Sequence, residues 1–499
     1  MTSIATKSSH PKLSVLVMLV LLAFSASSVA ERPNILILLA DDLGWNDVSY
    51  HGSQIRTPNI DRIAQSGIEL DRYYVQPTCS PTRAALMTGK LPMRLGLYRP
   101  INKNGSHGVP LDEKLLPQYL AELGYQRYAV GKWHMGHYQR GQTANARGFE
   151  HYYGSMTGGI GFWSKVHGGG YDWQRNGKTV REPGYATHLL VNEVQSLIRQ
   201  RDTTRPTFMY VAFQAPHLPN EAPQQAVSQY AGQFGDHPTR HMHAGMVHEM
   251  DQAIGQILTL YEEESMLDNT IVLFSGDNGG LVQPGPVETR TGTTALATRL
   301  MGWFDRPMPI DGFEFLVANT FDAGSDNTPL TGAKATYYEG GARVPGAIWW
   351  PGHLQSSDAY TAPITVVDVL PTLLDALGED VSALTHLDGR SQLAALQGGQ
   401  SQRMDYVTSD MMANLTIYQW PWKLIATDDP QLYNVMEDPL EQQDLAAAQP
   451  QRVASMRMAL AEYEFAEDPG IPWFDVLFDP DTFGGEEDGR PAWPDAVRD

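Results

Sequence analysis

Four apolar runs in the chain are each followed directly by polar residues. The run over 34–40 is almost unbroken, as is typical of a strand buried on both faces of a parallel sheet. Similar runs cover 125–130, 207–213 and 270–275. Segments with a helical pattern lie between them, such as the amphipathic stretch that begins at Thr57-Pro58. Strands that alternate with helices predict a doubly wound α/β fold with a mostly parallel sheet.

The polar residues after these runs predict a single site. In an open α/β sheet, ligands bind beyond the carboxyl ends of the strands. Motifs at four such ends are therefore expected to meet. The residues concerned are Asp41, Asp42, Lys132, His134, His217, Asp277 and Asn278.

Cys79 is the only cysteine of the chain, so it has no disulfide partner within it. In the sequence that follows, Ser80 is a favourable N-cap, Pro81 suits the first helical position and Gly89 can end the helix. We therefore expect Cys79 at a helix N-terminus, where free N–H groups and the helix dipole favour anions. Arg83 would lie one turn further, on the same side.

The first thirty residues differ from the rest of the chain. Lys7 and Lys12 precede a mostly apolar run over 13–24, and small residues over 28–30 suit a cleavage site. This pattern predicts a signal peptide over 1–30 and a periplasmic or secreted protein. The run is short for a bilayer span, and no later segment is long and apolar enough. We therefore expect no membrane anchor.

Composition narrows the possible partners. Hydrophobic residues make up 42% of the chain and charged residues 19%, which excludes a disordered protein. The formal net charge of −21 disfavours nucleic acid as a partner. An anionic substrate would therefore require positive charge concentrated at its site.

The motif C-x-P-x-R at 79–83, followed by a helix of small residues and Thr88-Gly89, resembles the signature of the formylglycine-dependent (type I) sulfatases. The resemblance covers most of the chain after residue 30. The chain is similar in particular to the arylsulfatase B subgroup, the N-acetylgalactosamine-4-sulfatases. It implies an alkaline-phosphatase-like fold with a smaller C-terminal α+β domain that contains an antiparallel sheet. The stretches that carry the subgroup resemblance are 41–47, 51–53, 109–114 and 244–247.

The resemblance also implies a mechanism. A formylglycine-generating enzyme or an anaerobic sulfatase-maturating enzyme would oxidise Cys79 to formylglycine, whose hydrate is the nucleophile. In this family match His134 takes a proton from the hydrate, and His217 or Lys334 protonates the leaving oxygen. The catalytic residues so implied are Cys79, Arg83, Lys132, His134, His217 and Lys334. Thr331 departs from the pattern, because relatives commonly have Arg there, and this leaves substrate detail open.

Ligand chemistry indicates a hard cation. Carboxylate and amide oxygens suit Ca²⁺ or Mg²⁺. The chain has no second cysteine that would suggest a zinc site. The family usually holds one Ca²⁺, which is our first expectation ahead of Mg²⁺. The expected ligands are Asp41, Asp42, Cys79, Asp277 and Asn278.

The histidines around residue 243 are interpreted differently. His241, His243 and His248 resemble a metal cluster, but in a helix positions i and i+2 point apart. We expect helix-surface residues or residues at the rim of the site.

The motifs divide the chain into two parts. They predict a catalytic domain over 31–385 and a C-terminal subdomain over 386–499, with strand-like runs near 406, 422–425 and 432–434 and a helix over 450–465. A long insertion over 281–326 separates the Asp277 and Lys334 motifs. Segments of this length are usually functional or disordered, so we expect a wall of the substrate cleft; a surface insertion or oligomer contact is the alternative. Its aromatic residues are Trp303, Phe304, Phe313, Phe315 and Phe321.

The expected function is release of sulfate from a sulfated carbohydrate. The subgroup resemblance suggests a 4-O-sulfate on a galactose or N-acetylgalactosamine unit of a carrageenan or glycosaminoglycan. Two alternatives stay open: a phosphate or phosphonate monoester hydrolase of the same superfamily, and an inactive chain that binds sulfated glycans. The sequence does not fix the oligomeric state or distinguish exo from endo action.

Overall fold

A computed structural model of the chain describes residues 1–2, 32–102, 106–167, 170–235, 237–282, 323–355, 359–401 and 403–470. The predicted signal peptide, the five aromatic residues of the insertion and the last part of the C-terminal subdomain lie outside the described residues. Those expectations stay predictions. Among the described residues, no helix combines the length and apolar character needed to cross a membrane.

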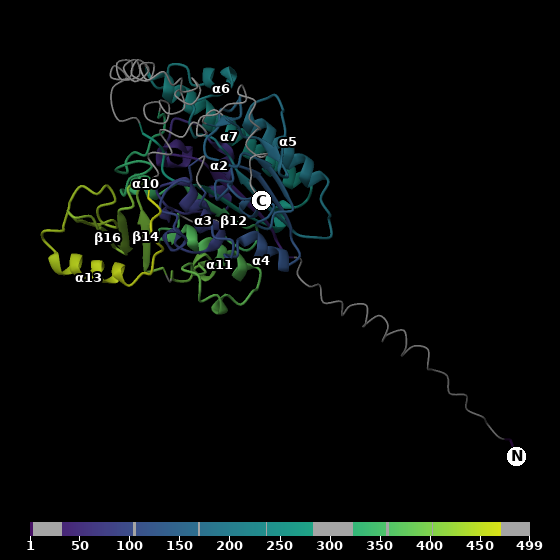
Figure 1. Cartoon of the computed structure of the whole chain (residues 1–499). Helices are drawn as coiled ribbons and strands as arrows, with labels where there is room; N and C mark the ends of the chain where they lie inside the picture. Colours follow the sequence, from purple (N-terminus) through teal and green to yellow (C-terminus); the bar gives the residue numbers. More distant parts are fainter. Residues whose placement is uncertain are drawn as a thin grey trace.

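A nine-stranded sheet forms the centre of the molecule (Figure 1). Its five middle strands are mutually parallel, which confirms the predicted fold class, and the outer strands at each edge pair antiparallel. Most of these outer strands have only two residues, too few for an apolar pattern to reveal. In spatial order the strands are β2 (Ile68–Glu69), β12 (Gly346–Trp349), β11 (Thr270–Gly276), β1 (Asn34–Ala40), β10 (Thr207–Ala212), β4 (Gln126–Gly131), β5 (His151–Gly154), β8 (Gln174–Arg175) and β9 (Lys178–Thr179).

Alternate residues of β1 belong to two different hydrophobic clusters. Ile35 and Ile37 pack on one side of the sheet, and Leu36 and Leu38 on the other. Burial of both faces explains the unbroken apolar run. Residues of helices α3 (Cys79–Thr88), α4 (Leu116–Glu122) and α11 (Val369–Ala376) join the first cluster, and those of α2 (Pro58–Ser66), α5 (Ala186–Arg199) and α7 (Pro238–Glu263) join the second.

A second, four-stranded antiparallel sheet lies beside the main body, near α10 (Figure 1). Tyr406 and Ile417 of this small sheet belong to the same hydrophobic cluster as α3, so the sheet packs onto the main domain. The division near residue 385 stays a prediction. The elements are β14 (Asp405–Ser409), β15 (Leu415–Gln419), β16 (Trp422–Ile425), β17 (Gln431–Asn434) and α13 (Pro450–Ala461), of which β15 was not expected.

Short elements complete the described fold. They are α6 (Gln224–Ser228), α10 (Glu339–Ala342), α12 (Leu393–Leu396), the parallel pair β3 (Tyr73–Tyr74) and β13 (Ile364–Thr365), and the antiparallel pair β6 (Val166–His167) and β7 (Gly170–Tyr171).

Backbone hydrogen bonds continue past the strand ends. The amide of Asp277 donates to the carbonyl of Ala40 at 2.9 Å, and the amide of Lys132 donates to that of Ala212 at 2.8 Å. The polar residues that follow four central strands are thereby held together at the carboxyl ends of these strands.

Candidate active site

Helix α3 begins at Cys79 itself, directly after the extended residue Thr78, and ends at Gly89 with a left-handed φ of 68°. The expected position of Cys79 at a helix N-terminus is confirmed. The expectation that Ser80 is the N-cap was wrong by two residues. Its hydroxyl instead accepts a hydrogen bond from the amide of Ile101 at 3.0 Å.

The Cys79 thiol lies in a buried, charged environment. Burial raises its pKa to about 12, although Lys132 and Lys334 act in the opposite direction. The thiol is therefore protonated at neutral pH. Because the thiolate is the reactive form of cysteine, the unmodified side chain is poorly suited to nucleophilic catalysis here.

Asp41, Asp42, Cys79 and His217 surround a common point, with one possible ligand atom from each lying within 4.8 Å of the others. All four are buried. Among the described residues, the buried oxygens Oδ1 of Asp41 and Oδ1 of Asn278 have no hydrogen-bond partner. A buried oxygen without a partner is unfavourable, and hard oxygen donors suit Ca²⁺ or Mg²⁺. The residues therefore fit a divalent cation.

Asp277 has different partners from the other expected ligands. Its Oδ2 accepts two hydrogen bonds from Arg83, from Nε at 2.9 Å and from Nη2 at 2.7 Å. Its Oδ1 accepts the amide of Asp42 at 3.2 Å. The third guanidinium nitrogen of Arg83 donates to the carbonyl of Lys132 at 2.9 Å. Arg83 thus links Asp277 to the end of β4.

Two lysines pair with the acidic residues after β1. Nζ of Lys132 lies 2.7 Å from Oδ2 of Asp41, and Nζ of Lys334 lies 2.7 Å from Oδ1 of Asp42. Burial alone would raise the pKa of Asp41, but the positive charges of Lys132, Arg83 and Lys334 hold it far below its usual value. Burial lowers and Asp42 raises the pKa of Lys334, with a net increase. Asp41 and Asp42 are therefore ionised and Lys334 is protonated at neutral pH.

Both expected histidines are buried and have one nitrogen facing a backbone carbonyl. Nε2 of His134 lies 2.9 Å from the oxygen of Ile101, and Nδ1 of His217 lies 2.6 Å from that of Leu218. Burial lowers both pKa values, so the rings are neutral. A carbonyl can only accept, so these nitrogens carry the proton. The other ring nitrogens, Nδ1 of His134 and Nε2 of His217, are then free to take a proton. Nε2 of His217 lies 3.6 Å from Asp42.

The backbone is unusual at two of these residues. Asp42 has a φ of 64° and His134 a φ of 55°, a region that non-glycine residues seldom adopt. Such conformations concentrate at active sites, where the surrounding fold holds them.

Residues of α7 that were not expected in the site hold its first loop in place. His243 is buried, and its Nε2 lies 2.8 Å from Oδ2 of Asp47. The same oxygen accepts a hydrogen bond from the amide of Gly44 at 2.9 Å. The other carboxylate oxygen of Asp47 pairs with Arg240. The interpretation of His243 as a helix-surface residue was wrong, because α7 turns this side toward the loop after Asp42. The i, i+3 spacing of Arg240 and His243 was the available signal.

The small sheet holds the loop that carries Lys334. The hydroxyl of Thr331 donates to the carbonyl of Leu440 at 2.6 Å, and the amide of Met411 donates to that of Ala335 at 3.2 Å. Thr331, the departure from the sequence pattern, therefore contacts the C-terminal part of the chain.

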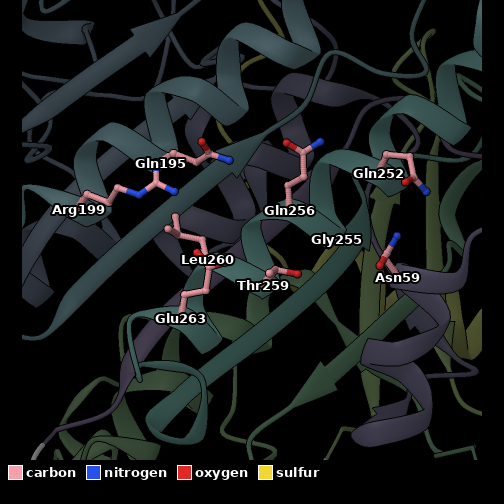
Figure 2. Close-up of a pocket in the computed structure, with 9 residues that line it drawn as sticks. All are labelled: Asn59, Gln195, Arg199, Gln252, Gly255, Gln256, Thr259, Leu260 and Glu263. Atoms are coloured by element: carbon pink, nitrogen blue, oxygen red, sulfur yellow. The ribbon is translucent and has the colours of Figure 1, made fainter.

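A surface groove of about 380 Å³ lies elsewhere, between α2, α5 and α7 (Figure 2). Gln256 and Glu263 line it and are exposed, and Gln195 is half-buried. Glu263 ends α7 shortly before β11 begins, so the groove lies toward the opposite edge of the sheet from Cys79.

A doubly wound sheet with a buried cluster of acids, lysines and histidines at its strand ends defines a hydrolase of the alkaline-phosphatase-like class. Residues 33–379 match the model of the family described as Sulfatase. The chain therefore belongs to the sulfatase family, a family of sulfuric ester hydrolases, as its motifs predict.

Individual relatives agree with this assignment. The chain is 31% identical over 385 residues to Arylsulfatase J of Mus musculus, covering 75% of this chain but only 58% of that protein. It is 30% identical over 437 residues to N-acetylgalactosamine-6-sulfatase of Homo sapiens, covering 80% of this chain and 73% of that protein. The crystal structure of Ps i-CgsB in complex with k-i-k-neocarrahexaose matches with a TM-score of 0.75 and 27% identity, covering 91% of this chain and 99% of that one.

Proposed function

We propose that this protein hydrolyses a 4-O-sulfate ester on a galactose or N-acetylgalactosamine unit of a carrageenan-type or glycosaminoglycan-type carbohydrate. The observation that carries the proposal is the meeting of Cys79, at the start of α3, with Lys132, Lys334 and the acids after β1. The similarity to a protein crystallised with a neocarrahexaose supports a carbohydrate substrate.

Cys79 is proposed to act after conversion to formylglycine, which supplies a hydrated aldehyde as the nucleophile. The buried, neutral thiol supports this, because the unmodified residue is a weak nucleophile in its place. The partner that carries out the conversion would be a formylglycine-generating enzyme or an anaerobic sulfatase-maturating enzyme.

Asp41, Asp42, Asn278 and the side chain at position 79 are proposed to hold Ca²⁺, with Mg²⁺ as the second choice. The bound cation would stabilise negative charge on the nucleophile and the sulfate oxygens. Oδ1 of Asp277 completes the proposed ligand set. Its other oxygen fixes Arg83, which acts by positioning the carboxylate and the start of the Lys132 loop.

The remaining residues supply charge and move protons. Lys132 and Lys334 are fixed cations that stabilise charge developing on the sulfate oxygens. Nδ1 of His134 is free to take a proton from the hydroxyl at position 79. Nζ of Lys334, which carries a proton, or Nε2 of His217, once it has taken one, is proposed to deliver a proton to the sugar oxygen that leaves.

The surroundings of the enzyme are part of the same proposal. The N-terminal pattern over 1–30 supports export to the periplasm or the medium. The segment 281–326 is proposed to form one wall of the substrate cleft. Gly280 and Asn327, at its two ends, are joined by hydrogen bonds of 2.9 and 2.8 Å beside the acidic cluster.

Defined oligosaccharides test the proposal directly. Purified protein is incubated with carrageenan and chondroitin oligosaccharides sulfated at position 4 or at position 6, and released sulfate is measured by ion chromatography. Release from the 4-O-sulfated members is expected. Preference for the 6-O-sulfated members would contradict the position assigned to the ester.

Two further measurements separate the alternatives. Matched aryl phosphate and aryl sulfate esters distinguish a phosphate or phosphonate hydrolase, which would favour the phosphate. Intact-mass analysis and trapping with a hydrazine detect the aldehyde at position 79. Its absence from a protein that binds oligosaccharides without releasing sulfate would favour the glycan-binding alternative.

A further inference from the structure

Among the described residues, Trp163 is the one Trp, Tyr or Phe with a clearly exposed side chain, and its exposed fraction is 51%. Single apolar residues on a protein surface are common and need no explanation by themselves. The position of Trp163 and the way its loop is built distinguish it from such residues.

Trp163 lies on a segment that starts at the candidate active site. Gly159 packs directly on His217, since a Cβ atom at Gly159 would lie 2.3 Å from Nδ1 of the imidazole. Further along, the amides of Phe162 and Trp163 donate to Oε2 of Glu221 at 2.7 and 3.2 Å. Segments 159–163 and 217–221 therefore leave the catalytic histidine side by side. Four extended residues span at most about 14 Å, which bounds the distance from Gly159 to Trp163.

The indole is held in a fixed place. Its ring contacts that of Tyr185 at 5.1 Å with a tilt of 50°, and the neighbouring Phe162 stacks on the same tyrosine at 5.3 Å. The Tyr185 hydroxyl donates to the carbonyl of Glu221 at 2.9 Å, and Nζ of Lys165 donates to that of Trp163 at 3.0 Å. A rigid aromatic loses little conformational entropy when a ligand covers it.

We propose that Trp163 is a stacking platform for a sugar unit next to the one whose sulfate enters the active site. This inference rests on the proposed function and deepens it. The ring of a galactose-type sugar presents a face of C–H groups with hydroxyls at its rim, and the exposed indole matches that face. A platform for the neighbouring sugar unit would contact an oligomeric substrate but not a small aryl sulfate, and Trp163 would therefore discriminate between the two.

Steady-state kinetics on two substrates test the platform. For Trp163→Ala, the KM for a sulfated oligosaccharide is expected to rise about 5- to 10-fold beyond any change for an aryl sulfate, with kcat largely retained. Trp163→Phe keeps an aromatic face and is expected to recover most of the loss. Met458→Ala removes another exposed apolar side chain, from α13, and serves as the control for a general surface effect.

Three outcomes would overturn the proposal. The first is an unchanged KM for the oligosaccharide in Trp163→Ala. The second is an equal loss of activity on both substrates, which would mean that the loop only supports His217. The third is an equal rise in KM in Met458→Ala. If the wild type releases no sulfate from any oligosaccharide, the proposed function fails separately. Calorimetry of oligosaccharide binding to Cys79→Ser protein then decides on the platform: a Kd raised 5- to 10-fold by adding Trp163→Ala supports it, and an equal Kd overturns it.

Discussion

Two of the buried charge clusters among the described residues satisfy their acids in different ways. One is the candidate active site at the strand ends of the main sheet. The other lies between α10 and the small sheet and consists of Glu339, Lys423 and Glu441, which are all buried.

The second cluster is held by groups of the protein. Nζ of Lys423 lies 3.1 Å from Glu339 and 2.7 Å from Glu441. The amide of Glu339 donates to Oε2 of Glu441 at 2.7 Å, and the hydroxyls of Tyr74 and Tyr418 donate to the Glu339 carboxylate at 2.8 and 3.2 Å. Burial raises the pKa of Glu441 to about 7, with Lys423 opposing and Glu339 adding to the shift. A proton on Glu441 thus balances the excess acid.

The active-site cluster leaves oxygen atoms unmatched around one point. Asp41 and Asn278 each keep a buried oxygen without a hydrogen-bond partner among the described residues. Oε1 of Glu441 also lacks a hydrogen bond of good geometry, but it lies 2.7 Å from Nζ of Lys423, whereas Oδ1 of Asp41 lies 3.8 Å from Nη2 of Arg83. The comparison teaches that burial and charge alone do not mark a site. The useful sign is a set of converging donors that the protein itself does not satisfy.

The largest difference between the clusters is expected on replacing the nucleophile. Cys79→Ser should abolish sulfate release, by at least about 1,000-fold, because serine is not a substrate for most aerobic maturation enzymes. The change is small and lies at a helix N-terminus, where serine is well tolerated. Circular dichroism and the melting temperature should therefore match the wild type. Near-normal turnover by the purified variant would refute the formylglycine assignment.

Removing a carboxylate from the active-site cluster should cost metal and activity together. In Asp277→Ala the cation loses a proposed ligand and Arg83 loses its bidentate partner. Calcium should reactivate a chelated wild type but restore the variant poorly, as measured by turnover and elemental analysis.

A buried acid elsewhere provides the matched control for this experiment. Asp251 accepts the amides of Asn59 and Ile60 at the start of α2, at 3.0 and 2.9 Å. Asp251→Ala should lower the melting temperature while leaving bound metal unchanged. A fully active wild type that contains no metal after exhaustive chelation would contradict the metal assignment.

The second cluster should respond to pH through stability. The pKa of Glu441 is raised in the folded state from 4.5 to about 7, so the folded chain retains a proton that the unfolded chain releases. The resulting stabilisation is complete below pH 4.5 and is lost as the pH rises through about 7; it is on the order of 3 kcal/mol.

Thermal melts of the wild type and Glu441→Gln between pH 5 and pH 8 measure this contribution. The variant cannot titrate at this position and leaves Lys423 paired with Glu339 alone. Its melting temperature should therefore fall less across this range. Parallel curves for the two proteins would mean that Glu441 does not hold the proton.

The smallest expected effect is confined to one substrate. Replacing 283–322 by a short Gly-Ser bridge keeps Gly280 and Asn327, whose paired amides close the base of the segment. Turnover of an oligosaccharide should fall far more than turnover of an aryl sulfate, which needs only the sulfate pocket. Equal loss on both, or no loss on either, would favour a surface insertion or an oligomer contact.

The sequence predicted those parts of the fold that depend on local pattern. The run over 34–40 indicated β1 because both of its faces are buried, and Gly89 marked the end of α3 because only glycine adopts a left-handed φ easily. The two-residue edge strands carry no comparable pattern. The motifs at strand ends predicted that Asp41 and His217 lie close together, because the carboxyl ends of parallel strands lie on the same side of the sheet.

Contacts between distant segments could not be predicted in this way. The burial of His243 against Asp47 depends on how α7 packs on the loop after β1, and Thr331 reaches Leu440 only because the small sheet docks there. The i, i+3 spacing of Arg240 and His243 indicates that the two share a face of α7, but neither contact partner can be deduced from one sequence.

The order of the chain places Cys79 far from the segments that close over it. The carbonyl of Pro77 accepts the amide of Ala335, and the carbonyl of Ala335 in turn accepts that of Met411. Ribosomes add about 5–20 residues per second, so tens of seconds pass between synthesis of the cysteine and synthesis of this cover. The thiol is therefore reachable early in the life of the chain and enclosed afterwards, which makes timing a requirement for any enzyme that modifies it.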